Sequence, residues 1–547
     1  MIDLASIKIG SLRYNSPWIQ VFILGFVCFS SVGMFSAIGG LGAGGTQDVA
    51  LSDTANGVLY GCFAIAGFFA GSINNILGVR LTLSLGTTGY SLYIGSLWCY
   101  QVNGTRWFLI FAGGILGVTA ALLWAAQGAV MMSYPLEKDK GTSFTLFWTI
   151  FQMGTLVGSA IALGIEIDST LPSVSTTVYI VFMIIMLTAI FSSWLLLPSR
   201  VEDLMLTEMG WYTDLVVRGD NTIVELEDAI SPQAEFREFG KLFKDWRMIA
   251  LFPMFFCSNY FYAYQVSTEM SVPIRVHSYP PRSSRQARLF SQTTLTPTPK
   301  KGAITSVLFN GRTRALTALL AGLGSTIGSI LIGILTDRLP FGRRKRAIWS
   351  WTFVLLLSIM IWSAGLAFQL KFTRADKIIK GVAIPWDWTQ NVSTGPMILI
   401  MGYYIADAAF QGLAYYTMSS MSNNPFKLAR MAGYYKGVQS AGAAISFGMD
   451  AVKTAYLGEI LISWLLLMVS MPLCLWVLWG VRDTNYDVEG VTRVEDVHGE
   501  VVVGREDGGK EGEGKMGHTA EDKELMPPSE LSASDLKVLD VVGDSKI

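Results

Sequence analysis

Uninterrupted apolar stretches of about 20 residues recur along most of the chain, and they limit what it can fold into. Each is long enough to cross the hydrocarbon core of a bilayer, which is about 30 Å thick. Inside a membrane the backbone polar groups must be bonded within the protein, so stretches of this kind are expected to be helices. Charged residues make up only 15% of the 547 residues, whereas about a quarter is usual in a soluble protein. The sequence therefore predicts an all-α, multi-pass membrane protein.

Apolar stretches and the polar breaks between them predict twelve transmembrane helices, arranged as two pseudo-symmetric bundles of six. The expected helices cover residues 17–38, 54–76, 81–101, 107–133, 143–165 and 176–198 in the first half, and 248–265, 315–336, 347–370, 395–420, 431–452 and 457–481 in the second.

The distribution of Lys and Arg predicts the orientation, because cytoplasmic loops carry an excess of both. Loops with Arg80, Lys138, Lys140 and the run 343–346 then lie inside, whereas the cations in 371–380 depart from the rule. The expected organisation is a cytoplasmic N-terminus (1–16), a first bundle (17–198), a cytoplasmic central loop (199–247), a second bundle (248–481) and a disordered cytoplasmic tail (482–547). The part of the central loop over 233–247 reads as an amphipathic interfacial helix.

Two sequons, at Asn103 and Asn391, fall in outer loops, where glycosylation takes place.

Several classes of function are excluded by composition. A net charge of −1 argues against a nucleic-acid partner. The five cysteines fall within apolar stretches and the three histidines outside them, so we expect neither a metal site nor a catalytic dyad in the membrane core. The sequence predicts no enzyme and no cofactor. The expected partners are the lipid bilayer and a small solute or ion, with another membrane protein as the alternative.

Two loops at corresponding places in the two halves share small, polar and basic residues. The loop after the eighth helix has an acid–arginine pair between two glycines, followed by a basic cluster. Glycine lets neighbouring helices approach closely, and the acid can pair with an arginine or a helix N-terminus when the cytoplasmic side is closed. Both loops are therefore predicted to act as gates. The gating residues are Gly71, Asn74, Asn75, Gly78 and Arg80 in the first half and Gly333, Asp337, Arg338, Gly342 and Arg343 in the second.

The loop that contains Asp337 resembles the signature of the major facilitator superfamily. In the first half the sequence departs from that pattern, because Asn74 and Asn75 stand in place of the usual acid. A charge-based latch is not expected there, although the two amides can form hydrogen bonds instead.

Within that superfamily the chain resembles the Unc-ninety-three-like branch, in particular its fungal membrane proteins. The residues that carry the resemblance are Trp124–Pro135, Phe147–Trp148, Ser258–Gln265 and Phe309–Arg314, which come from both halves. The branch includes presumed transporters and also non-transporting chaperones or regulators of other membrane proteins. The resemblance therefore implies a transporter working by alternating access or, as the alternative, a protein that escorts or regulates another membrane protein.

Polar residues within the apolar stretches mark a candidate substrate cavity. Asp407 lies midway along the tenth helix, where a charged side chain costs on the order of 3 kcal/mol. Gln411 and Tyr403 lie one helical turn to either side of it, and Gln127 with Trp124 occupies the matching place in the first half. We expect these five residues to line a central cavity. The alternative is a set of interhelical hydrogen bonds that only stabilises the bundle.

Two observations concern coupling to an ion gradient. The first and fourth helices carry no acid or base in their interiors, so proton coupling would have to use Asp407. Lys436 is a candidate partner for Asp407, although their expected depths in the membrane differ by about 10 Å.

Residues 266–301 interrupt the second half just after the seventh helix. The segment is rich in proline and arginine, and joining Gln265 directly to Gly302 would restore a continuous apolar stretch. It is either a retained intron or a disordered outer loop. Uniform transcript coverage from Gln265 to Gly302 would rule out the intron.

Overall fold

The structure is a computed structural model of the chain. It describes residues 8–9, 12–40, 49–166, 175–197, 216–218, 220, 222–224, 231–262, 264, 308–309, 311–373, 376, 378–379, 382–452, 454–487 and 489. The insertion 266–301 and most of the tail therefore lie outside the described residues.

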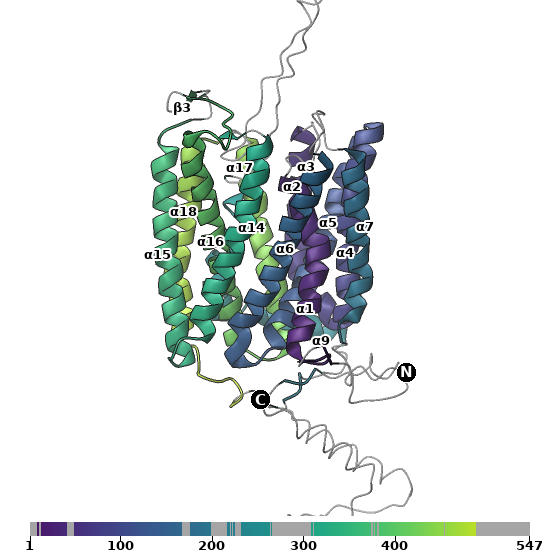
Figure 1. Ribbon diagram of the computed structural model, residues 1–547. Helices are drawn as coiled ribbons and strands as arrows, with labels where there is room; N and C mark the ends of the chain where they lie inside the picture. Colours follow the sequence, from purple (N-terminus) through teal and green to yellow (C-terminus); the bar gives the residue numbers. More distant parts are fainter. Residues whose placement is uncertain are drawn as a thin grey trace, which may run out of the picture.

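Long helices account for nearly all of the described regular structure (Figure 1). The first half consists of α1 (Pro17–Cys28), the π-helical turn η2 (Phe29–Gly33), α2 (Met34–Gly40), α3 (Val49–Leu77), α4 (Val79–Asn103), α5 (Arg106–Ser133), α6 (Lys140–Glu166) and α7 (Thr176–Ser192). The second half consists of α10 (Trp246–Cys257), α14 (Gly311–Asp337), α15 (Arg343–Gln369), α16 (Asn391–Ser420), α17 (Pro425–Ala451) and α18 (Tyr456–Trp479).

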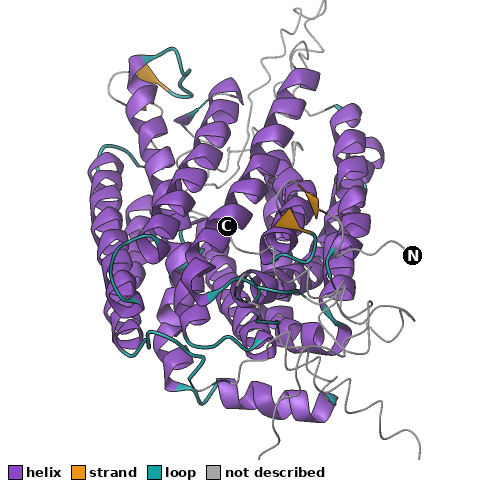
Figure 2. Ribbon diagram, turned by 60° about the horizontal axis from the view of Figure 1, so that its bottom comes forward, coloured by secondary structure: helices purple, strands orange, loops and turns teal. Residues whose placement is uncertain are grey.

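The remaining elements are short. Within the described residues, strands occur only as two antiparallel hairpins, β1–β2 (Lys8–Ile9 with Leu12–Arg13) and β3–β4 (Ile378–Ile379 with Val382–Ala383), drawn in orange in Figure 2. Two 3-10 turns, η4 (Glu137–Asp139) and η5 (Ser193–Leu195), lie beside α6 and α7, and α9 (Pro232–Leu242) lies in the central loop.

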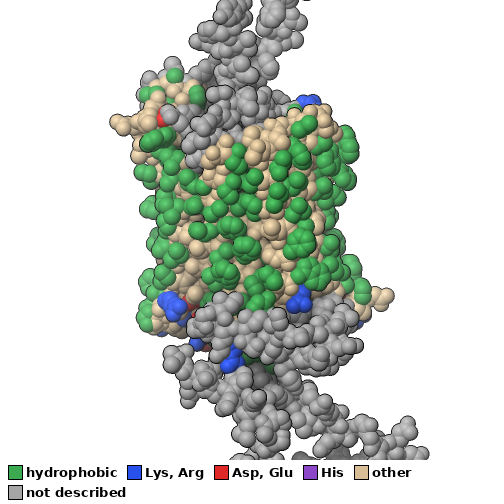
Figure 3. Space-filling view, turned by 45° about the vertical axis from the view of Figure 1, so that its right-hand side comes forward, with side chains coloured by type: hydrophobic (Ala, Val, Ile, Leu, Met, Phe, Trp, Pro, Cys, Tyr) green, Lys and Arg blue, Asp and Glu red, His purple; other side chains and the backbone are tan. Residues whose placement is uncertain are grey.

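The predicted all-α membrane fold is confirmed. Within the described residues, nine spans are long and apolar enough to cross a membrane, with α1, η2 and α2 together forming the first. Three further helices complete the two sets of six: α4 and α17 are long but less apolar, and α10 is shorter. On the face shown in Figure 3, apolar side chains cover the middle of the bundle, and Lys and Arg lie near its lower edge. This is the surface that a bilayer requires.

The two halves meet mainly along two helix pairs, α3 with α17 and α6 with α14, and α5 also packs against α17. If each helix of the first half corresponds to the helix six places later in the second, α3 corresponds to α14 and α6 to α17. A twofold rotation then exchanges the two pairs, as expected for duplicated bundles. Within the halves the packing also matches, because α4 packs on α7 as α15 packs on α18.

The end of the bundle where α14 leads into α15 carries Arg338 and the cationic run Arg343–Arg346, and we call it the basic end. The excess of positive charge predicts that it faces the cytoplasm. Helix α9 packs here against α3 and α17, with Phe239 buried and Phe236 exposed. The amphipathic helix predicted over 233–247 is thus present over a shorter range, and its apolar face contacts protein.

Both sequons lie at the opposite end of the bundle, where Asn103 is the last residue of α4 and Asn391 is the first of α16. Both side chains are exposed. We expect glycosidase treatment to lower the apparent mass of protein from a eukaryotic host. Asn103→Gln and Asn391→Gln should each remove one step of that shift on a gel. An unchanged gel position after treatment would contradict the orientation.

Candidate functional site

A buried carboxylate lies at the centre of a hydrogen-bonded cluster on α16. Asp407, whose side chain is 5% exposed, accepts hydrogen bonds from Gln411 Nε2 (2.9 Å) and Tyr262 Oη (3.2 Å). Asp407 and Gln411 are one helical turn apart on the same face of α16, whereas Tyr262 follows α10. Two different helical segments therefore supply the hydrogen-bond donors to this carboxylate.

The cluster continues through α17 to a buried lysine. Gln439 Nε2 donates to Gln411 Oε1 (3.2 Å), and Lys436 Nζ donates to Gln439 Oε1 (2.8 Å). Gln439 Nε2 also lies 2.9 Å from Ser258 Oγ. The side-chain amides of Gln411 and Gln439 thus connect the carboxylate of Asp407 to the ammonium of Lys436. The two charged residues are expected at different depths in the membrane, and this hydrogen-bonded chain spans the distance between them. We call Tyr262, Asp407, Gln411, Lys436 and Gln439 the central polar cluster.

Side chains of the first half complete this site. Lys436 Nζ lies 4.2 Å from the ring centroid of Trp124 on α5, which is within the range of a cation–π interaction. Tyr415 of α16 donates a hydrogen bond to Gln127 Oε1 on α5 (3.1 Å). The site is therefore built from both halves, at the surface along which they meet.

Four of the five predicted cavity residues come together at this place: Trp124, Gln127, Asp407 and Gln411. Tyr403 does not. Its ring packs edge-on against Trp362 of α15 at 5.2 Å, and among the described residues its hydroxyl has no hydrogen-bond partner. Tyr403 lies one helical turn before Asp407, at a level where α16 packs against α15. Its side chain therefore contacts the second half, to which α16 itself belongs.

Four residues of the site were not predicted from the sequence: Tyr262, Ser258, Gln439 and Tyr435, whose hydroxyl accepts a hydrogen bond from Gln439 Nε2 (3.1 Å). The first two lie in the stretch Ser258–Gln265, which carries part of the family resemblance. Tyr435 and Gln439 could have been predicted from their spacing, because they lie on one helix within a turn of Lys436.

The basic end is closed at the contact between α6 and α14. Asp337 Oδ1 accepts a hydrogen bond from the backbone N–H of Gly141 (3.1 Å), and its Oδ2 accepts one from Thr142 Oγ1 (2.8 Å). The first N–H groups of a helix are unpaired and carry partial positive charge. Asp337 therefore caps α6 across the boundary between the halves. Gly333 permits the approach, because a Cβ there would lie 2.1 Å from Thr145 Oγ1.

The corresponding contact between α3 and α17 uses a carboxylate from outside both helices. Asn75 Nδ2 donates to Glu235 Oε1 (2.9 Å) and to the carbonyl oxygen of Phe426 (3.0 Å). Glu235 lies on α9, is fully buried, and forms an ion pair with Arg430 of α17 at 2.7 Å. The acid that the α3–α4 loop lacks is thus supplied by the central loop.

Comparisons with known proteins identify the family. A family model described as "Ion channel regulatory protein UNC-93" matches residues 53–266. An UNC93-like protein of Schizosaccharomyces pombe is 36% identical over 485 residues, which cover 88% of this chain and 86% of that protein. The chain belongs to the UNC93-like family. UNC93-like protein 1 of Arabidopsis thaliana is 32% identical over 477 residues, covering 87% of this chain and 93% of the plant protein.

Solved structures show that the UNC93-like chain has the fold of the major facilitator superfamily. The proton:xylose symporter XylE superposes with a TM-score of 0.52 at 13% identity, covering 89% of this chain and 99% of XylE. A bacterial homologue of the iron transporter ferroportin, in an outward-facing state, gives a TM-score of 0.53 at 8% identity over 85% of this chain and 99% of its own. The UNC93-like branch predicted from the sequence is confirmed, and so is the predicted fold of the major facilitator type.

The other predicted gating residues of the first half of this UNC93-like protein have separate roles. Gly78 separates α3 from α4 with φ of 80°, in the region that favours glycine. Arg80 donates a hydrogen bond to the carbonyl oxygen of Leu196. Asn74 is buried, but among the described residues its Oδ1 has no hydrogen-bond partner.

In the second half, Arg343 and Gly342 begin α15, and Arg338 is exposed. Arg343 is 3% exposed and pairs with Glu137 of the first half at 3.2 Å. Arg343, which the loop pattern predicts to be a gating residue, therefore forms an ion pair between the two halves.

A lysine adds a further bond between the halves at the basic end of this UNC93-like protein. Lys140, the first residue of α6, donates to the carbonyl oxygens of Ser419 (2.6 Å) and Ser422 (3.2 Å) and to Asn423 Oδ1 (2.8 Å). All three acceptors lie where α16 turns into α17. Together with Asp337, Arg343 and Glu235, Lys140 holds the basic end closed.

Proposed function

We propose that this protein moves a small solute or ion across its membrane by alternating access. The observation that carries the proposal is the central polar cluster, in which Asp407 and Lys436 are buried where the two halves meet and are joined by two amides. Ionisable groups inside a membrane usually mark a substrate or ion pathway, because burying them is costly.

The bonding of the cluster favours a binding role over a purely structural one. A direct ion pair would satisfy both charges, yet Asp407 and Lys436 are each bonded to an amide instead. An amide side chain both donates and accepts, so Gln411 and Gln439 can exchange their partners for groups of a ligand. The aromatic faces of Trp124 and Tyr435 lie 4.2 and 5.0 Å from Lys436 Nζ and supply apolar contact area.

The closed basic end supplies the second requirement of alternating access, which is a gate that can open. Its bonds between the halves are side-chain hydrogen bonds and ion pairs at loops and helix ends, as with Asp337 and Arg343. Rigid bundles can separate there by breaking these few bonds without unfolding a helix.

Substituting Asp407 tests the proposal. An untargeted metabolite comparison between deletion and parent strains would supply the solute, and its flux is then measured in vesicles containing the purified protein. We expect Asp407→Asn to lower the flux at least tenfold, because the change removes the charge but keeps the size of the side chain. Any pH dependence of the flux that comes from this carboxyl should disappear as well.

The matched control is Asp487→Asn, which removes an exposed carboxylate near the end of the described chain. It should leave the flux unchanged. A wild-type flux and pH profile in Asp407→Asn would contradict a transport role for the cluster.

A second candidate function follows from the family model, whose description names an ion channel regulatory protein. In that case the protein binds and regulates another membrane protein and carries no solute. A stable partner recovered in mild detergent, together with no flux in vesicles, would favour this function.

A further inference from the structure

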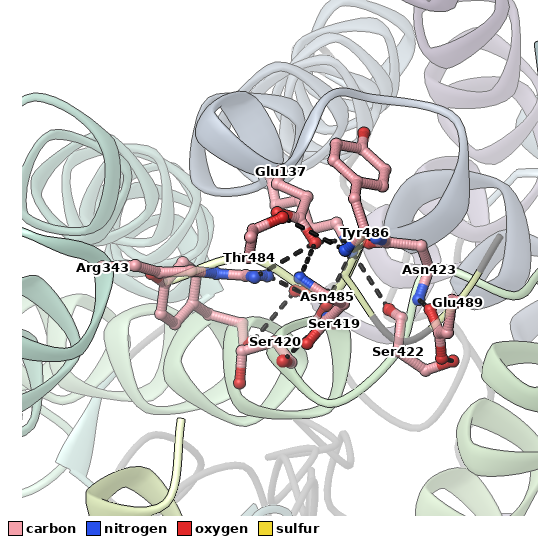
Figure 4. A network of polar contacts seen from close by, with 12 residues as sticks. Glu137, Arg343, Ser419, Ser420, Ser422, Asn423, Thr484, Asn485, Tyr486 and Glu489 are labelled. Carbon is pink, nitrogen blue, oxygen red and sulfur yellow. Dashed lines mark hydrogen bonds and ion pairs between the residues drawn. The ribbon is translucent and has the colours of Figure 1, made fainter. Parts of the chain in front are cut away.

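The chain continues past α18 along the basic end, where it contacts both halves (Figure 4). Its described residues here are Val481–Asp487 and Glu489, which we call the strap. The side chain of Asn485 is 7% exposed, whereas Asp487 between it and Glu489 is exposed. The strap therefore presents particular side chains to the bundle and others to solvent.

The strap bonds to the first half through Glu137, which lies in η4 between α5 and α6. The backbone N–H of Asn485 donates to Glu137 Oε1 at 2.9 Å. The same oxygen accepts a hydrogen bond from Asn423 Nδ2 (2.7 Å) and pairs with Arg343 (3.2 Å). Glu137 is thus held by three groups from the second half and the strap.

The strap bonds to the second half at the turn between α16 and α17. Asn485 Nδ2 donates to the carbonyl oxygen of Ser420 at 3.1 Å. Glu489 accepts two short hydrogen bonds, from Ser422 Oγ and from the backbone N–H of Asn423, each of 2.6 Å. Bonds to a carboxylate are about twice as strong as those between neutral groups.

These contacts make the strap sensitive to the state of the gate. Asn485 bonds at once to Glu137 of the first half and to Ser420 of the second. When the halves separate at the basic end, those two partners move apart and Asn485 cannot keep both. Opening therefore requires the strap to release at least one half.

We propose that the strap is an autoinhibitory segment that stabilises the closed basic end, so that its release favours the open state. The inference rests on the proposed alternating access. It assigns to the first residues after α18 the control of how often the gate opens.

The test compares two truncations of the full-length protein. A stop after Gly490 keeps the strap, whereas a stop after Gly480 removes it, and both lack the remainder of the tail. Spin labels at Lys138→Cys and Lys345→Cys, which are exposed positions on opposite halves of the basic end, report the distance across the gate. The labels require a background in which the five native cysteines are replaced.

We expect the stop after Gly480 to raise the fraction of molecules with the longer label distance about tenfold. That change corresponds to ~1.4 kcal/mol. The stop after Gly490 should match the full chain. Equal distance distributions for the two truncations would overturn the proposal.

A point variant keeps the test valid if the shorter truncation proves unstable in detergent. Glu489→Gln removes the charge that accepts from Ser422 and Asn423, and we expect it to shift the distances in the same direction. Asp487→Asn removes a neighbouring exposed charge and should shift nothing. An unchanged distribution in Glu489→Gln would also count against the strap.

The label distance is measured without any solute, so the two proposals can fail separately. If the label distance shifts in the strap variants but vesicles show no flux, the autoinhibitory role of the strap is supported and the transport function is contradicted. If vesicles show flux but the distance distributions are identical, the transport function is supported and the role of the strap is contradicted.

Discussion

Replacing Glu235 by alanine is expected to destabilise the protein by about 3–5 kcal/mol, the usual cost of removing one partner of a buried ion pair. Glu235 is fully buried, and it accepts hydrogen bonds from Arg430 Nε (2.7 Å), Arg430 Nη2 (3.1 Å) and Asn75 Nδ2 (2.9 Å). Its loss leaves the guanidinium of Arg430 buried without this carboxylate. The measurement is thermal unfolding of the purified protein, followed by the loss of the monodisperse species.

The same helix offers the matched control. Glu238 pairs with Lys241 at 2.5 Å, but the two side chains are 38% and 66% exposed. The hydrogen bond from Lys241 lowers the pKa of Glu238, yet exposed pairs of this kind contribute well under about 1 kcal/mol. We expect Glu238→Ala to leave the melting temperature nearly unchanged. Equal losses in the two variants would mean that α9 acts by general packing and not through the Glu235–Arg430 pair.

A double variant separates the charge from the contact. Replacing a whole buried pair by apolar residues of similar volume is often neutral or stabilising. Glu235→Leu combined with Arg430→Met should therefore be more stable than Glu235→Ala alone.

The helices were predictable because the bilayer imposes a length and a composition that can be recognised locally. The structure begins α6 at Lys140 and α15 at Arg343, a few residues before the apolar stretches begin. The difference arises because the charged first residue of each helix is bonded within the protein: Lys140 to the turn between α16 and α17, and Arg343 to Glu137.

Within the site, Asp407 and Gln411 were predictable because a charge within an apolar stretch stands out. Their partners were not, because Tyr262 and Gln439 belong to segments whose rotation about their own axes is set by tertiary packing. Tyr403 shows the same limit. Its spacing predicts that it shares a face of α16 with Asp407, but the packing of the neighbouring helices decides whether α16 contacts the other half or α15 at that level.

At the gate, the prediction that Asp337 pairs with a helix N-terminus had a physical basis in the loop itself. The corresponding role of Glu235 had no local signal, because Asn75 lies 160 positions earlier in the chain. The strap could not be predicted for a different reason. Composition averaged over 482–547 is typical of a disordered tail, whereas Asn485 and Glu489 at its start are bonded to the bundle.

Substituting Gly71 by alanine is expected to prevent the basic end from closing. A Cβ at Gly71 would lie 2.2 Å from the carbonyl oxygen of Ala429 and 2.7 Å from Arg430 Cα. Both are backbone atoms of α17, so no side chain can rotate away and the helices must separate. Gly67 is similarly close to Gly437, since a Cβ there would lie 2.6 Å from Gly437 Cα. We expect a loss of stability of about 1–3 kcal/mol, as for other overpacked sites, and a shift of the Lys138–Lys345 label distance to longer values.

Gly61, on the same helix, provides the control for helix propensity. A Cβ at Gly61 would have no atom within 4 Å. Alanine is favoured over glycine inside a helix by about 1 kcal/mol, so Gly61→Ala should be neutral or stabilising. Gly71→Ala has the same gain in helix propensity, but the clash with α17 outweighs it. The opposite signs expected for two identical substitutions on α3 isolate the backbone contact with α17. A Gly71→Ala protein that melts like Gly61→Ala and keeps the short label distance would show that α3 and α17 do not close the gate by direct backbone contact.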